Sequence, residues 1–459
     1  MAGATGTRGN GLTRGELLRR AGVAAAAVAV GGAKAPYAFA GPMRHTGRSL
    51  QGDLSIVQWS HFVPKYDAWF DDTWAKSWGE RNDVQVNVDH VAYTRLPELA
   101  ATEARAKRGH DIFGFLAPPS RYESDVIDHS AIVSQLERNV GPYGDLGLRS
   151  TYNPKTKRYF GVSDYFVPAP LIWRHDLWNS LGESPATWDH VRAAAPALKA
   201  LGHPIGIGQA NELDSNTALA GFMTCFGSFV QDESNALTID TPETVEAVRF
   251  MADLYAAGEE STVFGWDPAS NNEFLLAGKG SLILNAISAI RRAEDLGMPF
   301  ANDLWIWPVP FGPHGRLGLP QYTSVYSIWK FAKNIGAAEK FIVDLCTESE
   351  QAVLASKLFN FPSFPSAFPV RKIYKSAAAD THPPRGKYTI LTTVANTYTT
   401  NVGYPGYANA AVQEAFDTFL IPRMFAQVSR GTMSAEDSVR STASEMRQIW
   451  ARWRAAGKI

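Results

Sequence analysis

The sequence predicts an α/β protein made of two lobes that extended segments connect. A chain of 459 residues with 45% hydrophobic content is too long for one hydrophobic core and suits two. After Gly52, strand-like and helix-like patterns alternate, which predicts mostly parallel sheets flanked by helices. The stretch Gly161–Asp176 has no helical period and contains Pro168 and Pro170. Because proline cannot donate to a strand ladder, this stretch favours an extended crossing between two units over a central strand.

The first forty residues have the features of an export signal. Several arginines precede the short apolar run Ala21–Gly32, and Ala38–Ala40 supplies the small residues of a cleavage site, so we expect cleavage after Ala40. The stretch Leu12–Arg20 is similar to a twin-arginine signal, but Gly15 stands where the second arginine belongs, which leaves the general secretory route open as well. No cysteine for lipid attachment follows the apolar run. We therefore expect a soluble protein that is extracellular or periplasmic.

Charge and cysteine content exclude several classes of protein. The formal net charge is −1 and the sequence pI is about 6.8, so no overall field favours nucleic acid or an acidic membrane. The partner is expected to be a small molecule or another protein. Cys225 and Cys346 permit one disulfide at most and no metal cluster, and their spacing leaves their pairing open.

The first part of the chain alternates strand and helix. We predict strands at Leu54–Trp59, Val84–Val88 and Asp111–Phe115 and helices at Tyr66–Trp78 and Thr94–Arg108. This order predicts parallel strands with right-handed crossovers. Ligands of such sheets sit at the carboxyl ends of the strands, which places Trp59, His61 and Phe115 at that edge.

A second series begins after the crossing. We predict helices at Trp188–Leu201, Thr217–Val230 and Thr241–Ala257 and strands at His203–Gln209, Ser281–Asn285 and Tyr322–Phe331. Thr241 is the expected cap of its helix, with Pro242 at the first helical position and Gly258 at the end. Ser434 and Asp437 form a capping-box-like start for the last helix.

Catalytic and cofactor motifs are incomplete. Gly278–Ser281 is similar to part of a phosphate loop, but Glu273 occupies the position of its first glycine. Gly206–Gly208 matches the start of a dinucleotide fingerprint, yet Asn211 stands at the third glycine. Gly-x-Ser-x-Gly and His-Glu-x-x-His are missing, and the ten histidines lack ligand spacing. We therefore predict no catalytic residues, no metal and no cofactor, and hence no enzyme.

From Gly52 onward the chain resembles the extracellular solute-binding proteins of ABC importers, in the branch that includes maltose-binding protein. The resemblance rests on a series of short pieces in a common order. They are Trp59 on the opening strand, Gly109–Phe113, Tyr159–Val162, Leu171–Trp178, Pro185–Trp188, Phe274–Gly280 before Asn285, and Ile328–Asn334 with Ala337 and Ala338.

The resemblance implies a periplasmic-binding-protein-like fold with two hinged lobes. Such a protein captures a solute between its lobes and delivers it to permease subunits in the membrane, and we expect it to be monomeric. The implied segments are residues 52–161 with 321–369 for lobe 1, 168–315 with 370–459 for lobe 2, and 162–167 and 316–320 for the crossings.

The implied solute is a mono- or oligosaccharide. Sugars offer apolar faces to aromatic rings and hydroxyl groups to polar side chains. By position in the family pattern, the expected ligand-binding residues are Trp59, His61, Phe115, Asp164, Tyr165, Glu212, Trp266, Asn271, Asn285, Tyr322 and Ser324. Asp164→Ala and Trp266→Ala are expected to weaken binding by an order of magnitude or more.

Two other classes of function stay open. A polyamine or another cationic solute would use the same fold, with Asp164 and Glu212 pairing its amines and the aromatic rings packing on its methylenes. An exported carbohydrate-active enzyme would need a nucleophile or a carboxylate pair, which the sequence does not display. Titration against sugars and polyamines separates the first two classes, and product formation would reveal the third.

Overall fold

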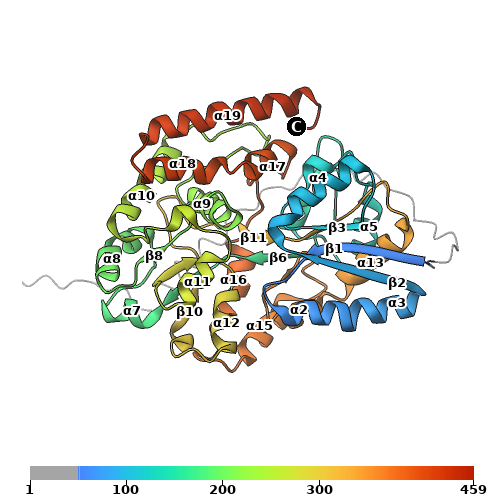
Figure 1. The fold of residues 1–459 in the computed structure, drawn as a ribbon, viewed down its shortest axis with the longest axis horizontal. Coiled ribbons are helices and arrows are strands. Elements are labelled where there is room, and N and C mark those ends of the chain that lie inside the picture. The colour runs from blue at the N-terminus through green and yellow to red at the C-terminus, as the bar shows by residue number, and fades with distance from the viewer. Residues whose placement is uncertain (1–49, 51) are drawn as a thin grey trace, which may run out of the picture. The chain divides into compact units, whose positions relative to one another are not determined.

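The computed structural model describes Leu50 and residues 52–459, and the predicted export signal, residues 1–40, lies outside them. Strands and helices alternate along this part of the chain (Figure 1). The strands are β1 (Gly52–Trp59), β2 (Val84–Val91), β3 (Ile112–Phe115), β4 (Tyr152–Asn153), β5 (Arg158–Tyr159), β6 (Tyr165–Pro168), β7 (Leu171–Arg174), β8 (Ile205–Gly206), β9 (Leu282–Leu284), β10 (Leu304–Trp307), β11 (Pro320–Thr323), β12 (Val325–Ile328) and β13 (Phe361–Pro362).

Helices make up most of the remaining regular structure. The α-helices are α2 (Pro64–Trp69), α3 (Lys76–Asn82), α4 (Leu96–Ala106), α5 (Ser130–Val140), α6 (Asp145–Thr151), α7 (His175–Ser180), α8 (Trp188–Ala200), α9 (Leu213–Cys225), α10 (Pro242–Gly258), α11 (Ser270–Leu276), α12 (Ser288–Asp295), α13 (Ile335–Thr347), α14 (Ser349–Ala355), α15 (Val370–Ala379), α16 (Ile390–Thr397), α17 (Ala410–Asp417), α18 (Leu420–Ser429) and α19 (Ala435–Ala455). Short 3₁₀-helices include η3 (Tyr93–Arg95), η4 (Ser120–Tyr122) and η5 (Val263–Gly265), and a π-helix, η2 (Phe70–Ala75), separates α2 from α3.

The first lobe is built around a sheet with the strand order β12-β3-β1-β2. β1 pairs in parallel with β2 and β3, and β12 pairs antiparallel with β3. This sheet is mostly parallel, as the sequence predicts. The carboxyl ends of β1 and β3 therefore lie at the same edge, as the rule for parallel sheets requires.

The second lobe is built around a sheet with the strand order β10-β7-β9-β8, and the expectation of a mostly parallel sheet is wrong here. β8 and β9 pair in parallel, but β7 pairs antiparallel with both β9 and β10. β7 is the strand that brings the chain in from the crossing. It inserts between two strands that run the opposite way, which makes two of the three pairings antiparallel.

The crossing segment forms a small sheet of its own, with the order β11-β6-β13 and antiparallel pairing throughout. The prediction that prolines keep this segment from being a central strand is therefore wrong. Pro168 is the last residue of β6 and lies opposite Pro320 at an irregular register, so the ladder ends where the donors are missing. This three-stranded sheet joins the two lobes.

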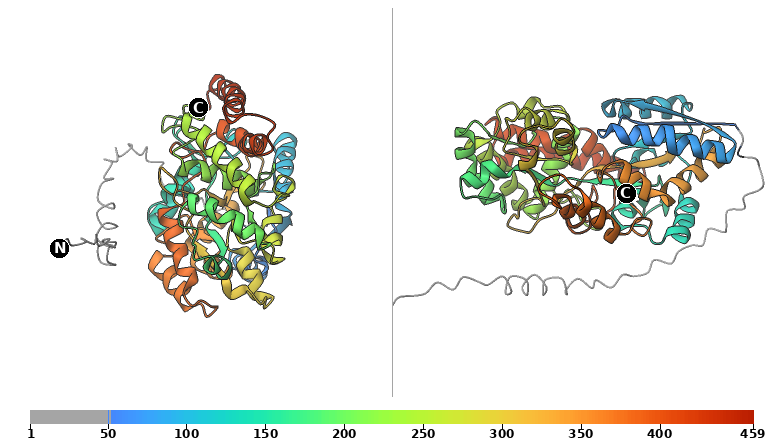
Figure 2. Two further views of the ribbon diagram at one scale, coloured as in Figure 1. Left: turned by 90° about the vertical axis from the view of Figure 1, so that its left-hand side faces the viewer. Right: turned by 90° about the horizontal axis from the view of Figure 1, so that it is seen from below.

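Hydrophobic packing follows the alternation of the β7 side chains. Ile172 belongs to a large core that also contains the residues of the first sheet and of the three-stranded sheet. Leu171 and Trp173, which point to the other face, belong to a second core together with residues of α8, α9, α10 and the C-terminal helices. In Figure 1 the blue elements of the first lobe and the green elements of the second lie at opposite ends, with β6 and β11 between them, and the right-hand view of Figure 2 shows the same separation of colours.

The C-terminal helices also contact the first lobe through polar groups. Gln413 on α17 accepts hydrogen bonds from the Arg121 backbone N–H at 2.7 Å and from the Ser120 hydroxyl at 3.3 Å. Arg121 forms an ion pair with Asp417 at 3.1 Å. These contacts join η4 to α17 outside the three-stranded sheet.

The two helix starts singled out in the sequence are confirmed. Thr241 accepts a hydrogen bond from the Thr244 backbone N–H at the start of α10, with Pro242 as the first helical residue. Ser434 accepts from the Asp437 backbone N–H at 3.1 Å at the start of α19. Both caps satisfy backbone donors that the helix itself leaves unpaired.

Cys225 and Cys346 are both buried and both free, so they do not form a disulfide with each other. Within residues 52–459 no helix has the length and apolar character needed to cross a membrane. No group of three or more His, Cys, Asp or Glu side chains in the described part of the chain is arranged to hold a metal ion.

Candidate functional site

The site begins with aromatic side chains at the end of β1 and in the small sheet. Trp59, the last residue of β1, donates a hydrogen bond from Nε1 to the Tyr165 hydroxyl at 3.2 Å. The Trp59 ring also lies 5.2 Å from the ring of Tyr322 on β11. Three residues from the expected set therefore meet where the first lobe joins the three-stranded sheet.

His61 is buried beside Trp59 and is held by hydrogen bonds at both ring nitrogens. The Val63 backbone N–H donates to Nδ1 at 2.9 Å, which leaves Nε2 to donate to Asn360 Oδ1 at 3.1 Å. Burial lowers the pKa of His61 to about 4, against smaller opposing effects of these hydrogen bonds. The ring is therefore neutral at physiological pH, and its centroid lies 4.8 Å from that of Trp59.

A chain of polar side chains from the second lobe reaches the same place. Asn285, directly after β9, donates from Nδ2 to Asn271 Oδ1 at 2.8 Å. Asn271 on α11 donates to Asp214 Oδ2 at 2.9 Å, and the Tyr322 hydroxyl donates to Asp214 Oδ1 at 3.2 Å. Asp214 thus links the asparagine pair to the aromatic cluster. Burial raises its pKa, and the hydrogen bonds from Asn271 and Tyr322 act against that shift.

Glu212 caps the helix on which Asp214 lies. Its carboxylate accepts hydrogen bonds from the backbone N–H groups of Asp214 at 2.6 Å and Ser215 at 2.5 Å. Burial raises the pKa of Glu212, and the negative charge of Asp214 raises it further. Both carboxyl oxygens of Glu212 therefore bind backbone N–H groups at the start of α9. Because one of these groups belongs to Asp214, Glu212 holds the Asp214 backbone in place and also adds a negative charge next to it.

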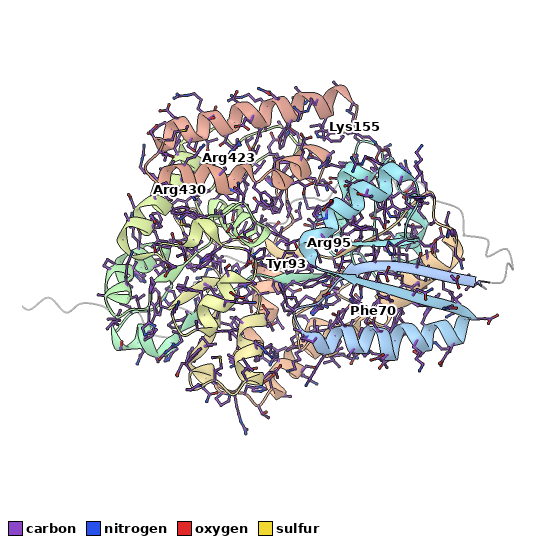
Figure 3. All side chains as sticks on the ribbon, viewed as in Figure 1. Phe70, Tyr93, Arg95, Lys155, Arg423 and Arg430 are labelled. Carbon is purple, nitrogen blue, oxygen red and sulfur yellow. The ribbon has the colours of Figure 1, made fainter. Side chains whose placement is uncertain are left out.

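Two aromatic residues that the sequence argument missed complete the cluster. Phe62 lies 5.3 Å from Trp59 and 6.3 Å from Tyr322 between ring centroids, and its ring meets that of Tyr93 edge-on at 5.7 Å. Tyr93 follows β2 and lies near the centre of the view in Figure 3.

Tyr93 belongs to the first lobe but faces the acidic side chains of the second. The pKa of Tyr93 is raised first by burial and then by the charges of Asp214, Glu212 and Asp267. We call the set Trp59, Phe62, Tyr93, Asp214, Asn271, Asn285 and Tyr322 the interlobe cluster.

Asp164 and Ser324 lie close to this cluster but inside the protein. Asp164 is 6% exposed, and its Oδ1 has no hydrogen-bond partner among the described residues. Burial raises the pKa of Asp164 to about 7, partly offset by the Ser324 side chain. The Ser324 backbone N–H donates to the Tyr165 carbonyl at 3.0 Å. Both residues therefore sit in the connection between the lobes.

Trp266 and Phe115 were expected to bind the ligand, but the structure places both outside the interlobe cluster. Trp266 packs on Phe274 at 5.4 Å between ring centroids and donates from Nε1 to Thr262 at 3.1 Å. Phe115 packs on Phe113 at 4.5 Å and forms further ring contacts with Tyr122 and Trp329. Trp266 is half-buried in the second lobe, and Phe115 belongs to the core of the first.

The sequence does contain a signal for Tyr93 and Asp214, which were not among the expected ligand-binding residues. Tyr93 follows β2 just as His61 follows β1, and the rule that ligands sit at the carboxyl ends of strands applies to both. Asp214 comes two residues after Glu212, in the segment that follows β8. Nothing in the sequence separates the two carboxylates, because only the folded helix shows that Glu212 caps it while Asp214 points toward Tyr322.

The interlobe cluster joins two kinds of surface. The first lobe and the small sheet supply aromatic rings, and the second lobe supplies a carboxylate and two amides. Rings of this kind pack on apolar C–H faces, while carboxylate and amide groups hydrogen-bond to hydroxyl or amine groups. These are the two kinds of side chain typical of sites for small molecules that have both an apolar face and polar edges.

Comparison with protein families finds one match that spans more than half of the chain. Residues 60–352 match the model of the family described as bacterial extracellular solute-binding protein. Among individually curated proteins, no sequence matches significantly.

Solved structures of several sugar-binding proteins share the fold. Maltose-bound MalE3 of T. maritima superposes with a TM-score of 0.72 at 18% identity, over 87% of this chain and all of that one. A sugar transporter protein from Arthrobacter chlorophenolicus with bound laminaribiose gives 0.72 at 17% identity, over 86% and 99% of the two chains. The GacH receptor of Streptomyces glaucescens, studied with acarbose, gives 0.68 at 17% identity, over 87% and 98%.

Proposed function

Because the chain belongs to the bacterial extracellular solute-binding proteins, we propose that its solute is a mono- or oligosaccharide held at the interlobe cluster. The observation that carries this proposal is the meeting of Trp59 and Tyr322 with the Asp214 carboxylate. Aromatic faces and a charged acceptor within one site match the two kinds of surface that a sugar presents. The bound maltose and laminaribiose of two proteins with the same fold support the choice of sugar.

The way the cluster is assembled suggests how a solute is held. Tyr322 is on the sheet that joins the lobes, Tyr93 is on the first lobe, and Asp214 is on the second. A sugar that enters between the lobes replaces the Tyr322–Asp214 hydrogen bond with bonds to its own hydroxyl groups. Closure of the lobes over the sugar then requires rotation about the strands that connect them, as in other hinged binding proteins.

Binding without chemical conversion is part of the proposal. The family model describes a binding protein. Asp214 is held by Asn271 and Tyr322, and Glu212 by two backbone N–H groups, so both carboxyl groups have structural partners.

We further propose that the protein acts as a monomer and passes its solute to ABC permease subunits. The proposed lobe segments are residues 52–161 with 321–369 and residues 168–315 with 370–459.

A cationic solute such as a polyamine is the second candidate, and one observation favours it. The charges of Glu212, Asp214 and Asp267 all act on Tyr93, and no ion pair joins Glu212 or Asp214 to a described lysine or arginine. An amine would supply the missing positive charge, and the aromatic rings would pack on its methylene groups by cation–π contact. Sugar hydroxyls satisfy the same carboxylates without charge.

Calorimetric titration separates the two candidates. The mature protein is titrated with maltose, laminaribiose and a set of monosaccharides, and separately with putrescine and spermidine. Saturable binding of a saccharide, with unchanged sugar after long incubation, is the expected result. Binding of amines alone would replace the sugar with the cationic candidate, and release of a cleaved product would show that the protein is an enzyme.

A further inference from the structure

A separate pocket of about 270 Å³ opens between α18 and the segment that follows β8. The residues that matter for its chemistry are Gln209, Asn211, Phe264, Arg423, Gln427 and Arg430. None of its lining residues belongs to the interlobe cluster. Its volume approaches the lower end of small-molecule pockets, about 300 Å³.

Arg423 on α18 and Arg430, the residue directly after that helix, give this pocket a positive wall (Figure 3). Arg430 lies over the Phe264 ring at 4.4 Å and forms no ion pair with a described carboxylate. Arg423 forms an ion pair with Glu445 at 2.6 Å, so its charge is partly compensated. The guanidinium of Arg430 is therefore the group available for an anion, and its planar donors suit a carboxylate.

Gln209 gives the pocket a buried acceptor. Its side chain is 1% exposed, and its Nε2 donates to Glu259 Oε2 at 2.8 Å. Its Oε1 has no hydrogen-bond partner among the described residues. Buried acceptors are normally paired, so this oxygen calls for a donor such as a hydroxyl group.

The neighbouring acid, Glu259, opposes an anion less than an exposed carboxylate would. Glu259 is fully buried and also accepts a hydrogen bond from the Ile207 backbone N–H at 3.0 Å. Burial raises the pKa of Glu259, so its carboxyl carries less negative charge at neutral pH than an exposed carboxylate would. The positive charge of Arg430 thus dominates on this side of the pocket.

We propose that this pocket binds a hydroxycarboxylate of the size of a sugar acid. Arg430 pairs with the carboxylate, a hydroxyl group donates to Gln209 Oε1, and the carbon skeleton packs against Phe264. This pocket and the interlobe cluster share no residue. A sugar acid bound here would occupy the second lobe without displacing the transported solute.

Titration with galacturonate tests the proposal, with galactose and inorganic phosphate as comparison probes. Galacturonate is expected to bind the intact mature protein, and Arg430→Gln is expected to weaken that binding tenfold or more. Arg440→Gln is the matched control, because Arg440 is an exposed arginine on the neighbouring α19. It is expected to bind galacturonate as the unchanged protein does.

Three results would overturn the proposal. One is equal galacturonate affinity in the Arg430→Gln variant. Another is equal affinity for inorganic phosphate, or a loss of galactose affinity in Arg430→Gln as large as the loss of galacturonate affinity, since the pocket would then recognise anions or sugars in general. The third is loss of galacturonate binding in Asp214→Asn, which would place the sugar acid in the interlobe cluster. If no saccharide binds at the interlobe cluster, galacturonate is still expected to bind at the Arg430 pocket.

Discussion

The Tyr322 hydroxyl donates a hydrogen bond of 3.2 Å to Asp214 Oδ1 and thereby joins β11 to the start of α9. Asp214 is 4% exposed and Tyr322 is 1% exposed, so this bond forms in a largely dry environment. A charged acceptor in such surroundings binds strongly to whichever donor is present. The pair is therefore the natural place for a solute hydroxyl to substitute for a protein group.

Asp214→Asn is expected to weaken sugar binding at least tenfold, which corresponds to about 1.4 kcal/mol. The amide loses the charge that strengthens hydrogen bonds from hydroxyl groups, an effect of roughly 1.5–3 kcal/mol per bond. Calorimetric titration measures the change. Asp189→Asn serves as the control, because the Asp189 side chain is 75% exposed on α8. Equal affinities in the two variants would remove Asp214 from the site.

Tyr93→Ala is expected to weaken sugar binding three- to tenfold with little change in stability. The lost contact is an aromatic face, and such contacts contribute about 0.5–1.5 kcal/mol beyond simple burial. Tyr374→Ala is the matched control, since Tyr374 is 51% exposed on α15. Fluorescence titration of both variants gives the comparison. Unchanged affinity in Tyr93→Ala would show that the ring only covers the acidic side chains.

Asp164→Asn is expected to flatten the dependence of stability on pH. Burial raises the pKa of Asp164 to about 7, so the folded protein holds this proton more tightly than the unfolded chain. The protonated Asp164 carboxyl therefore makes its full contribution to the unfolding free energy below about pH 4. That contribution is lost as the pH rises to about 7. Between pH 5 and pH 8 the unfolding free energy of the unchanged protein should fall by up to about 3 kcal/mol relative to the variant.

Urea unfolding at several pH values measures this difference. His61 contributes the opposite slope, since its pKa is lowered to about 4 and its stability is lost as the pH falls below about 6.5. That contribution is common to both proteins and cancels in the comparison. Parallel curves for the variant and the unchanged protein would contradict the prediction.

Glu212→Ala is expected to lower the unfolding free energy by about 1 kcal/mol, because α9 loses the cap that holds two backbone N–H groups. Glu212→Gln keeps an acceptor and should retain much of that stability. Thermal unfolding distinguishes the variants. If Glu212→Gln instead abolishes amine binding while sugar binding persists, the carboxylate acts on the solute through its charge.

Much of the local structure could be predicted from the amino-acid sequence. The caps at Thr241 and Ser434 and the parallel pairing of β1 with β2 and β3 depend on neighbours in the sequence or on a simple strand–helix alternation. The two lobes and their solute-binding family followed from the order of short pieces along the chain. These features need no knowledge of distant contacts.

The roles of individual side chains were decided by packing between distant segments. Phe115 has the position of a ligand residue in the pattern, yet its ring packs on Phe113 and Trp329. Glu212 and Asp214 look alike in the sequence, but the first caps α9 and the second meets Tyr322, 108 positions away. Periodicity tells which side of an element is buried, but it carries no information about which distant side chain lies opposite. That pairing exists only in the folded chain.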